Sequence, residues 1–296
     1  MRTVLRWSAR IAAVTLLLIL VAAGAVYGLS ERRLHAHYDV RSHPFAARTD
    51  AGAVAEGARL VTVKGCVDCH GANLTGNVII DDPLVGRLAG PNLTRGGRGA
   101  TLSDEDWERA VRHGVRRDGA SLAVMPSNEF NGLSDADLGA IVAYVRSLPA
   151  DTTPTVPVRA GPLIRTLFVA GQVDLASASS IDHARPHPAS VVAEPTAAFG
   201  KYLAQGCTGC HGAGFSGGKI PGAPPDWKPA ANITPEGIGR YTEADFMRVL
   251  RAGRRPDGSA VDSLMPYRLM KHMTDVELRA LYAYLRTVPP RPYGQR

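Results

Sequence analysis

Hydrophobic residues are distributed along the chain in one long N-terminal run and in shorter stretches that repeat a helical spacing. The long run extends from Ile11 to Leu29 without a charged residue. Its flanking charges are Arg2, Arg6 and Arg10 before it and Glu31, Arg32 and Arg33 after it. A transmembrane helix needs about 20 apolar residues, whereas the apolar region of a signal peptide has about 7–15. Residues 1–33 are therefore expected to form an uncleaved membrane anchor, the alternative being a signal peptide cleaved at Ala23-Gly24-Ala25.

Three helical segments are predicted in the first half of the remaining chain. The first covers roughly 54–65. The second begins with the capping box Ser103-x-x-Asp106 and ends near Gly114, and the third begins at Ser134 and stops at Pro149. The same signals return in the second half at 196–206, Thr242-x-x-Asp245, Gly253, Thr274 and Pro289. Because no alternating strand pattern is evident between them, we expect an all-α fold.

The two halves also match residue by residue at a nearly constant offset. The matching segments are Asn92-Leu93-Thr94 with Asn232-Ile233-Thr234, Asp118-Gly119 with Asp257-Gly258, and Met125-Pro126 with Met265-Pro266. We therefore expect a tandem repeat of one domain, with the first copy at residues 53–149 and the second at residues 196–296. Residues 34–52 are then a spacer, and residues 150–195, rich in proline, a semi-rigid linker. An apolar stretch from Leu163 to Gly171 in that linker could form a short helix.

A second feature of both repeats is the pattern C-x-x-C-H, which uses all four cysteines of the chain. It is formed by Cys66, Cys69 and His70 and again by Cys207, Cys210 and His211. This pattern is the attachment signature of a c-type haem, with the cysteines as covalent attachment sites and the histidine as an axial ligand of the iron. A zinc site usually places its cysteine pairs closer together, and a thioredoxin-like dithiol does not require the histidine. The sequence thus predicts two covalently bound haem c groups.

The sixth ligand of each iron is expected to be a methionine. Met125 and Met265 both precede a proline, and they occupy the same place in the two repeats. In the first repeat His113 is a rival ligand, but the repeat does not preserve it, and a surface position at a helix C-terminus is the preferred interpretation. In the second repeat Met247, Met270 and Met273 suit core packing better. His35, His37 and His43 in the spacer are expected to be solvated.

With these residues in view, each repeat resembles a class I cytochrome c domain. The phrases Pro91-Asn92-Leu93-Thr94, Arg255-Pro256-Asp257-Gly258 and Met265-Pro266 are similar to those of the membrane-bound cytochrome c subunits of quinoprotein and flavoprotein dehydrogenases. Those subunits commonly hold three haem domains, whereas this chain holds two. The resemblance implies that the Pro91 carbonyl orients the first axial histidine. The second copy departs from the family in having Ala231 at this position, where the backbone carbonyl could still make the hydrogen bond. Asn92 and Asn232 are further candidates around these histidines.

Charge and composition limit the partners. The 296 residues carry a net charge of +7, but the arginines are scattered and no nucleic-acid-binding motif is present. No nucleic acid partner is therefore expected, and an acidic docking partner would suit the charge. The arginines before the apolar run favour a cytoplasmic N-terminus. The haem domains would then lie on the periplasmic side of the inner membrane, with a single membrane span.

The expected function is electron relay. His/Met ligation gives a six-coordinate iron, so two such sites could pass electrons from a dehydrogenase or quinol-oxidising complex to a cytochrome or terminal oxidase. The alternative is a dihaem enzyme, such as a peroxidase or a thiosulfate-oxidising enzyme. A peroxidase needs an open site at one iron, and a methionine in the same place in both repeats argues against it. No catalytic residue is assigned.

Overall fold

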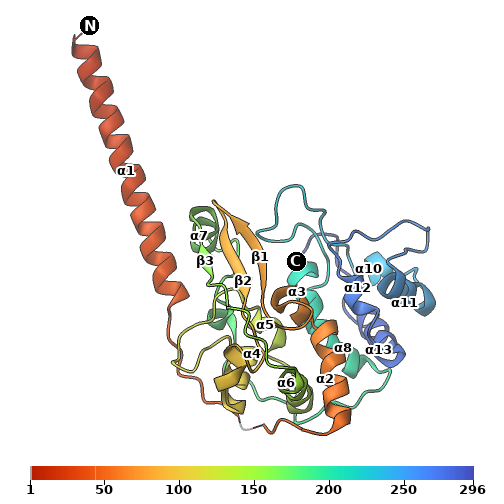
Figure 1. Ribbon diagram of the computed structural model, residues 1–296. Helices are drawn as coiled ribbons and strands as arrows, with labels where there is room; N and C mark the ends of the chain where they lie inside the picture. The colour runs from red at the N-terminus through yellow and green to blue at the C-terminus, as the bar shows by residue number, and fades with distance from the viewer. Residues whose placement is uncertain (1, 44) are drawn as a thin grey trace.

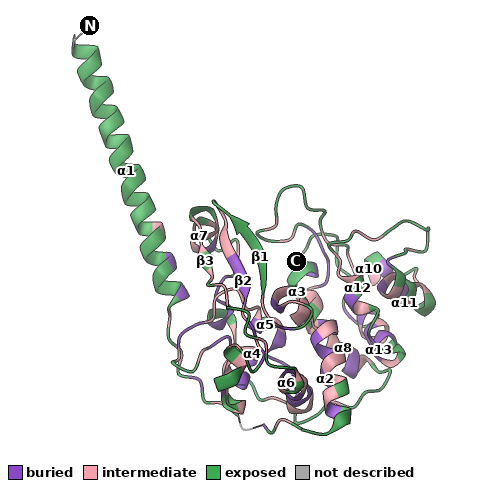
Figure 2. Ribbon diagram, in the orientation of Figure 1, coloured by how far each residue is buried: buried purple, intermediate pink, exposed green. Residues whose placement is uncertain are grey.

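A single long helix projects from a mostly helical body (Figure 1). The computed structural model describes residues 2–43 and 45–296. The projecting helix is α1 (Arg2–Leu34), and nearly all of it is exposed (Figure 2). Within Thr3–Leu34 an 18-residue window reaches a mean hydropathy of 2.4, so by length and composition this helix could cross a membrane or serve as a signal sequence.

The body contains the three helices predicted in each half. In the first half they are α2 (Ala51–Val63), α4 (Asp104–His113) and α6 (Asp135–Ser147). Their second-half counterparts are α8 (Ala197–Leu203), α11 (Glu243–Ala252) and α13 (Asp275–Leu285). The shorter helices are α3 (Cys66–His70), η1 (Arg98–Thr101), α5 (Ser127–Phe130), η2 (Ser177–Ser180), η3 (Ala204–Cys207), α9 (Thr208–His211), α10 (Pro235–Ile238) and α12 (Tyr267–Met270). The predicted helical fold is confirmed.

Each half is built on one crossing of its first and third helices, α2 with α6 and α8 with α13. Both crossings depend on a glycine that lets the two backbones approach. A Cβ placed on Gly57 would lie 1.9 Å from the Ala140 carbonyl oxygen, and one on Gly200 would lie 1.9 Å from that of Ala280. Any side chain at these two positions would therefore push the helices apart.

The predicted helix ends are also seen. Ser103 and Asp106 form a reciprocal capping box at the start of α4, and Thr242 and Asp245 do the same for α11. Both helices end at a glycine in the left-handed conformation, with φ of 63° at Gly114 and 62° at Gly253. Glycine adopts this conformation without the steric cost that a Cβ brings.

A small sheet accompanies the helices, although the sequence showed no alternating strand pattern. Strands β1 (Asn77–Asp82) and β2 (Gly86–Gly90) form an antiparallel hairpin from Asn77 opposite Gly90 to Asp82 opposite Gly86, and β3 (Arg159–Ala160) joins β2 on its other edge. All residues of β1 are exposed, so the strand has no buried face to produce an alternating pattern. The third strand comes from the linker and is only two residues long.

The linker contains the predicted short helix, α7 (Pro162–Val169), which packs beside the end of α1. Arg165 donates to Ser30 Oγ at 2.8 Å and forms an ion pair with Glu31 at 2.7 Å. In the opposite direction Arg33 donates to the carbonyls of Phe168 and Val169. Leu34 is buried in the same apolar cluster as Phe168. We call this arrangement the α1–α7 clamp.

The two halves pack against each other through equivalent residues. Arg59 of α2 reaches the start of α13, where its two Nη atoms donate to Glu277 at 2.7 and 2.9 Å. Tyr202 occupies the equivalent place in α8, two residues after the crossing glycine, and reaches the start of α6. Its hydroxyl donates to Asp137 at 2.5 Å and accepts from the Ser134 N–H at 3.0 Å. The halves thus form a pseudo-symmetric pair within one chain.

Candidate haem-binding sites

The first C-x-x-C-H motif lies on the wall of a cavity of ≈ 510 Å³. Cys66, Cys69, His70 and Met125 all line this cavity. The remaining wall is largely apolar, and its side chains include Leu74, Trp107, Phe130, Leu133 and Ile141. These same apolar residues belong to the main core cluster of the first half, so the cavity opens directly onto that core. A flat, largely apolar group could be enclosed there.

The imidazole of His70 is oriented by the backbone of the loop that follows the hairpin. Its Nδ1–H donates to the Pro91 carbonyl at 2.9 Å. A carbonyl can only accept, so the proton must be on Nδ1 and the lone pair on Nε2. Burial lowers the pKa of His70, which is 7% exposed, and this keeps the ring neutral. The ring therefore has the tautomer and charge that a metal ligand needs.

The second motif has the same arrangement with a different residue as acceptor. His211 Nδ1–H donates to the Ala231 carbonyl at 2.7 Å. His211 is as buried as His70, and burial lowers the pKa of His211 as well. Replacement of proline by alanine at this place thus leaves the hydrogen bond intact, because the backbone carbonyl provides it.

Asn92 and Asn232 hold the loops that carry these two carbonyls. The Asn92 side chain accepts from the Thr94 N–H at 2.9 Å and donates to the Asp151 carbonyl at 2.7 Å. Asn232 accepts from the Thr234 N–H at 2.9 Å and donates to the Arg291 carbonyl at 2.7 Å. Each asparagine thus ties its loop to the chain that follows the last helix of its half.

The loop that carries Met125 is held by the linker. Ser177 Oγ donates to the Met125 carbonyl at 2.8 Å and accepts from the Ser127 N–H at 3.1 Å. Val124, whose N–H donates to the Leu175 carbonyl at 2.8 Å, has φ of 73°. A β-branched residue is strained in this left-handed conformation, and such strain persists where the surroundings impose it. The linker therefore contributes directly to the position of Met125.

Met265 stands in the equivalent loop of the second half and is partly buried against its core. Its backbone N–H donates to the Asp262 carbonyl at 3.0 Å, within the same loop. Met247 and Met270 are also partly buried against this core, and Met273 is a buried member of it. The two methionine loops thus differ in which part of the chain supports them.

The first cysteine of each motif has a raised thiol pKa. Burial raises the pKa of Cys66 to about 12 and that of Cys207 to about 11. A redox-active dithiol has a lowered thiol pKa, because the thiolate is its nucleophile. The environment of these two cysteines therefore does not favour a thioredoxin-like reaction.

Trp107 provides a test of whether the cavity suits a haem. Its ring lines the cavity and is only 4% exposed, and the indole Nε1 is buried without a hydrogen-bond partner among the described residues. A buried donor of this kind is stabilised by an acceptor on the enclosed molecule. Haem carries two propionate carboxylates that could accept from it, and Arg98, Arg116 and Arg117 also line the cavity. The residues present fit a haem. Phe246 occupies the equivalent place in the second half, where the donor is missing.

Three residues near the sites were missed by the sequence analysis. Trp107 could have been found as an aromatic residue four positions after the cap Ser103. Ser177 and Glu129 had no signal, because the first lies in the linker and the second precedes a helix end.

His113 was expected at the surface, and this was wrong: the side chain is fully buried beside Glu108 and His183. The linker covers the helix end that would otherwise be exposed.

The fold and the repeated motif define a protein with two helical domains, each of which carries one C-x-x-C-H motif. A family model described as Cytochrome c matches residues 54–149 and 197–289. The chain therefore belongs to the cytochrome c family.

Among curated proteins, the chain is 29% identical over 283 residues to the cytochrome c subunit of the quinone alcohol dehydrogenase of Gluconobacter oxydans. The match covers 84% of this chain and 58% of the relative. It is 26% identical over 288 residues to the gluconate 2-dehydrogenase cytochrome c subunit of Pantoea cypripedii, covering 85% of this chain and 64% of that protein. The fructose dehydrogenase cytochrome subunit of Gluconobacter japonicus is 33% identical over 154 residues, covering 49% of this chain and 28% of the relative. The chain thus spans less than two thirds of the length of these relatives.

Proposed function

We propose that this chain is a membrane-anchored dihaem cytochrome c that relays electrons from a dehydrogenase or a quinol-oxidising complex to a respiratory acceptor. The observation that carries the proposal is that one largely apolar cavity is lined by both cysteines, the histidine and the methionine of the first repeat. The second repeat has the same residue types in the same order. With a histidine and a methionine at each site, neither iron would have an open coordination position.

The protein residues have separable roles in this proposal. Cys66, Cys69, Cys207 and Cys210 would form thioether bonds to two haem c groups. His70 and His211 would bind the iron through Nε2, which the hydrogen bonds at Nδ1 leave free, and Met125 and Met265 would each supply a second protein ligand. When bound, haem supplies an iron that gains and loses one electron while these ligands stay in place. The apolar wall of the cavity would exclude water from it.

Contacts between the halves support transfer from one site to the other. Asp68 in the first motif helix, α3, forms an ion pair with Arg268 of α12 at 3.2 Å. Glu129 of α5 lies against Gly209 in the second motif helix, α9. Each motif helix is thus close to the helix that follows the methionine of the other half. This arrangement favours a short path between the two haems.

The donor is proposed from the relatives. These relatives are cytochrome subunits of alcohol, gluconate and fructose dehydrogenases. We infer that this chain also receives electrons from a dehydrogenase subunit that oxidises a small organic substrate. The N-terminal helix would hold the chain in the inner membrane, with both haem domains on the periplasmic side.

Carbon monoxide binding to the reduced, purified protein tests the relay directly. If both irons are six-coordinate with firmly held ligands, the visible spectrum does not change on addition of the gas. A change at one haem would reveal an open or labile site and would favour the alternative, a dihaem enzyme such as a peroxidase or thiosulfate-oxidising enzyme. Adding hydrogen peroxide or thiosulfate to that sample would then separate these two activities.

The donor and the anchor are tested in native membranes. A C-terminally tagged chain is expected to co-purify in detergent with a dehydrogenase subunit, and the substrate of that subunit should reduce both haems. The intact mass of the purified protein should be that of a chain that retains the N-terminal helix. A mature protein that begins near residue 26 would show cleavage and remove the anchor, while leaving the electron-transfer proposal intact.

A further inference from the structure

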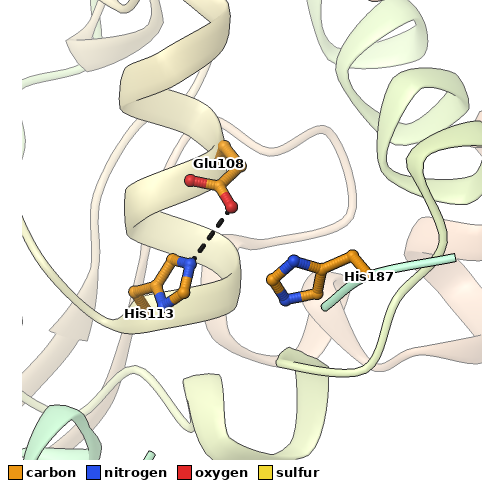
Figure 3. A group of neighbouring side chains, drawn as sticks. All are labelled: Glu108, His113 and His187. Carbon is orange, nitrogen blue, oxygen red and sulfur yellow. Dashed lines mark hydrogen bonds and ion pairs between the residues drawn. The ribbon is translucent and has the colours of Figure 1, made fainter. Parts of the chain in front are cut away.

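A cluster of buried polar side chains lies outside the haem sites, where the end of α4 meets the linker (Figure 3). It contains Glu108 and His113 from α4 and His187 from the linker. One ligand atom of each residue lies within 4.8 Å of the others. Glu108 and His113 are fully buried and His187 is partly buried. We refer to these three residues as the Glu–His–His cluster.

The hydrogen bonds around the cluster leave several atoms without partners. His113 Nε2 lies 3.1 Å from Glu108 Oε1, and His113 Nδ1 lies 3.0 Å from His183 Nδ1. Of the eight buried side-chain atoms without a partner in the described residues, six lie here: Glu108 Oε2, Arg112 Nε and Nη1, His183 Nε2, and both ring nitrogens of His187. Burying an unpaired polar atom is costly, so this concentration indicates a ligand that the cluster binds.

We propose that the Glu–His–His cluster is a binding site for a divalent transition metal ion, for which Zn²⁺ is the best fit. Two imidazoles and one carboxylate are a donor set that zinc uses. The 3.1 Å separation of His113 Nε2 and Glu108 Oε1 is close to that of two ligands on one zinc ion, since Zn–N and Zn–O bonds are about 2.0–2.2 Å. His187, which has a ligand atom within 4.8 Å of both, would complete the set.

The surroundings match a metal site in two further respects. When a metal ion occupies His113 Nε2, the Nδ1–H can donate to His183 Nδ1, which is the orienting hydrogen bond that ligating histidines usually make. Both ring nitrogens of His187 are buried without a partner among the described residues, so either one is available to bind a metal ion. The site does not depend on the proposed electron relay.

Arg112 is the positive charge next to the cluster, with Nη1 3.8 Å from Glu108 Oε1. Its Nη2 donates to Asp135 at 2.8 Å and to the Leu133 carbonyl at 2.7 Å. Glu108 and Asp135 together carry one more charge than the Arg112 guanidinium, so the local charge is negative when the histidines are neutral. A divalent cation is therefore electrostatically acceptable here.

The ion would connect the linker to the first domain. Residues 177–189 pack along that domain, where the Pro188 and Ala189 carbonyls accept from the N–H groups of Asp135 and Ala136. The same segment carries Ser177, which holds the Met125 loop. Metal binding would thus stabilise the support of the first methionine from a distance, without contact with the haem.

The test uses the purified protein with both haems, stripped of loose metal by a chelator and titrated with zinc chloride in a calorimeter. We expect one tight zinc ion per chain and a rise of several degrees in the thermal midpoint. His187→Ala, a change in the linker that leaves the helix intact, should weaken zinc binding at least tenfold. Glu108→Gln, which keeps the hydrogen bond to His113, should do the same. His272→Ala, an exposed histidine, is the matched control and should bind as the unmodified chain does.

Metal content of the protein, measured after gel filtration, gives a second readout besides calorimetry. An unmodified chain that binds no zinc would overturn the proposal. Equal zinc affinity in the unmodified chain and in a folded His187→Ala variant would overturn it as well, because the ion would then be held elsewhere.

Discussion

Met125 and Met265 stand at equivalent places, but different parts of the chain hold them. The Met125 carbonyl accepts from Ser177 of the linker, whereas the Met265 N–H donates to the Asp262 carbonyl of its own loop. The sites also differ in the Trp107 donor, which Phe246 replaces. These local differences give the two irons different surroundings, so we expect two distinct potentials in a redox titration.

Met125→His is expected to keep the haem and to lower the potential of the first site by roughly 0.1–0.2 V, because a thioether ligand raises the potential relative to imidazole. A spectroelectrochemical titration measures the change. Met247→Leu, a packing residue of the second core, serves as the control and should leave both potentials in place. An unchanged curve for Met125→His would mean that Met125 is not a ligand.

Glu129 predicts a pH dependence. Burial raises the pKa of this carboxyl to about 7, and the side chain lies against the second motif helix at Gly209. Above that pH the added negative charge favours the oxidised iron, so a neighbouring haem potential should fall as pH rises through about 7. The slope is bounded by ~59 mV per pH unit for one proton and one electron.

Glu129→Gln should remove this slope and raise the potential at pH 8, with little effect at pH 5, where the native carboxyl is already neutral. Potentials measured from pH 5 to pH 9 check it. Glu194→Gln, an exposed linker residue, should keep the native slope. If the haem potential had the same pH slope in the native protein and in both variants, Glu129 would not influence the haems.

At the scale of the elements, the helix crossings decide stability. Gly57→Ala or Gly200→Ala would place a methyl group 1.9 Å from a carbonyl oxygen of the partner helix, so the helices must separate. We expect each change to lower the free energy of unfolding by about 3 kcal/mol, the upper part of the range for overpacking. Chemical denaturation of the haem-loaded protein measures the loss.

The control for this experiment is Gly206→Ala, since a Cβ at that position would have no atom of another described segment within 4 Å. It should be neutral or slightly stabilising, because alanine restricts the unfolded chain. If Gly57→Ala were equally harmless, the two crossings could not depend on close backbone approach.

These elements show how far the sequence leads. The capping box of α4 and its terminal Gly114 are local signals, and both were predicted because their partners are within a few residues. The start of α6 at Ser134 was predicted as well, but not the partner of the Asp137 carboxylate. Ser134 does accept from the Asp137 N–H, but the Asp137 carboxylate accepts from Tyr202 of the other half. Likewise the burial of His113 depends on linker residues about 70 positions away. Contacts between distant segments leave no local pattern from which to infer them.

At the scale of the whole molecule, Arg59 connects the halves. It binds Glu56 of its own helix and Glu277 of the other half, whose side chain is only 6% exposed. Arg59→Met would leave Glu277 buried without this cation, although the Thr274 N–H still donates to it. We expect a loss of about 3 kcal/mol, as for other broken buried ion pairs, and separate unfolding of the two halves in calorimetry.

Adding Glu277→Gln to Arg59→Met should recover part of this loss, because the orphaned charge is then gone. A matched exposed pair offers the control: Arg48→Met removes the ion pair with Asp50 at the surface and should cost less than about 1 kcal/mol. A single unfolding transition in Arg59→Met, at the native temperature, would show that the halves do not depend on this contact.

The α1–α7 clamp has a consequence for how the protein meets its partners. A flexible linker would let the haem domains take many orientations relative to the bilayer. A membrane helix whose end is held by the α1–α7 clamp instead fixes the orientation of the domains. Under the proposed anchoring, one face of the domains stays turned toward the lipid and another toward the periplasm. Encounters with a donor in the same membrane then become a search by lateral diffusion in two dimensions, at a fixed height and orientation. Weakening the α1–α7 clamp would slow productive docking without altering either haem.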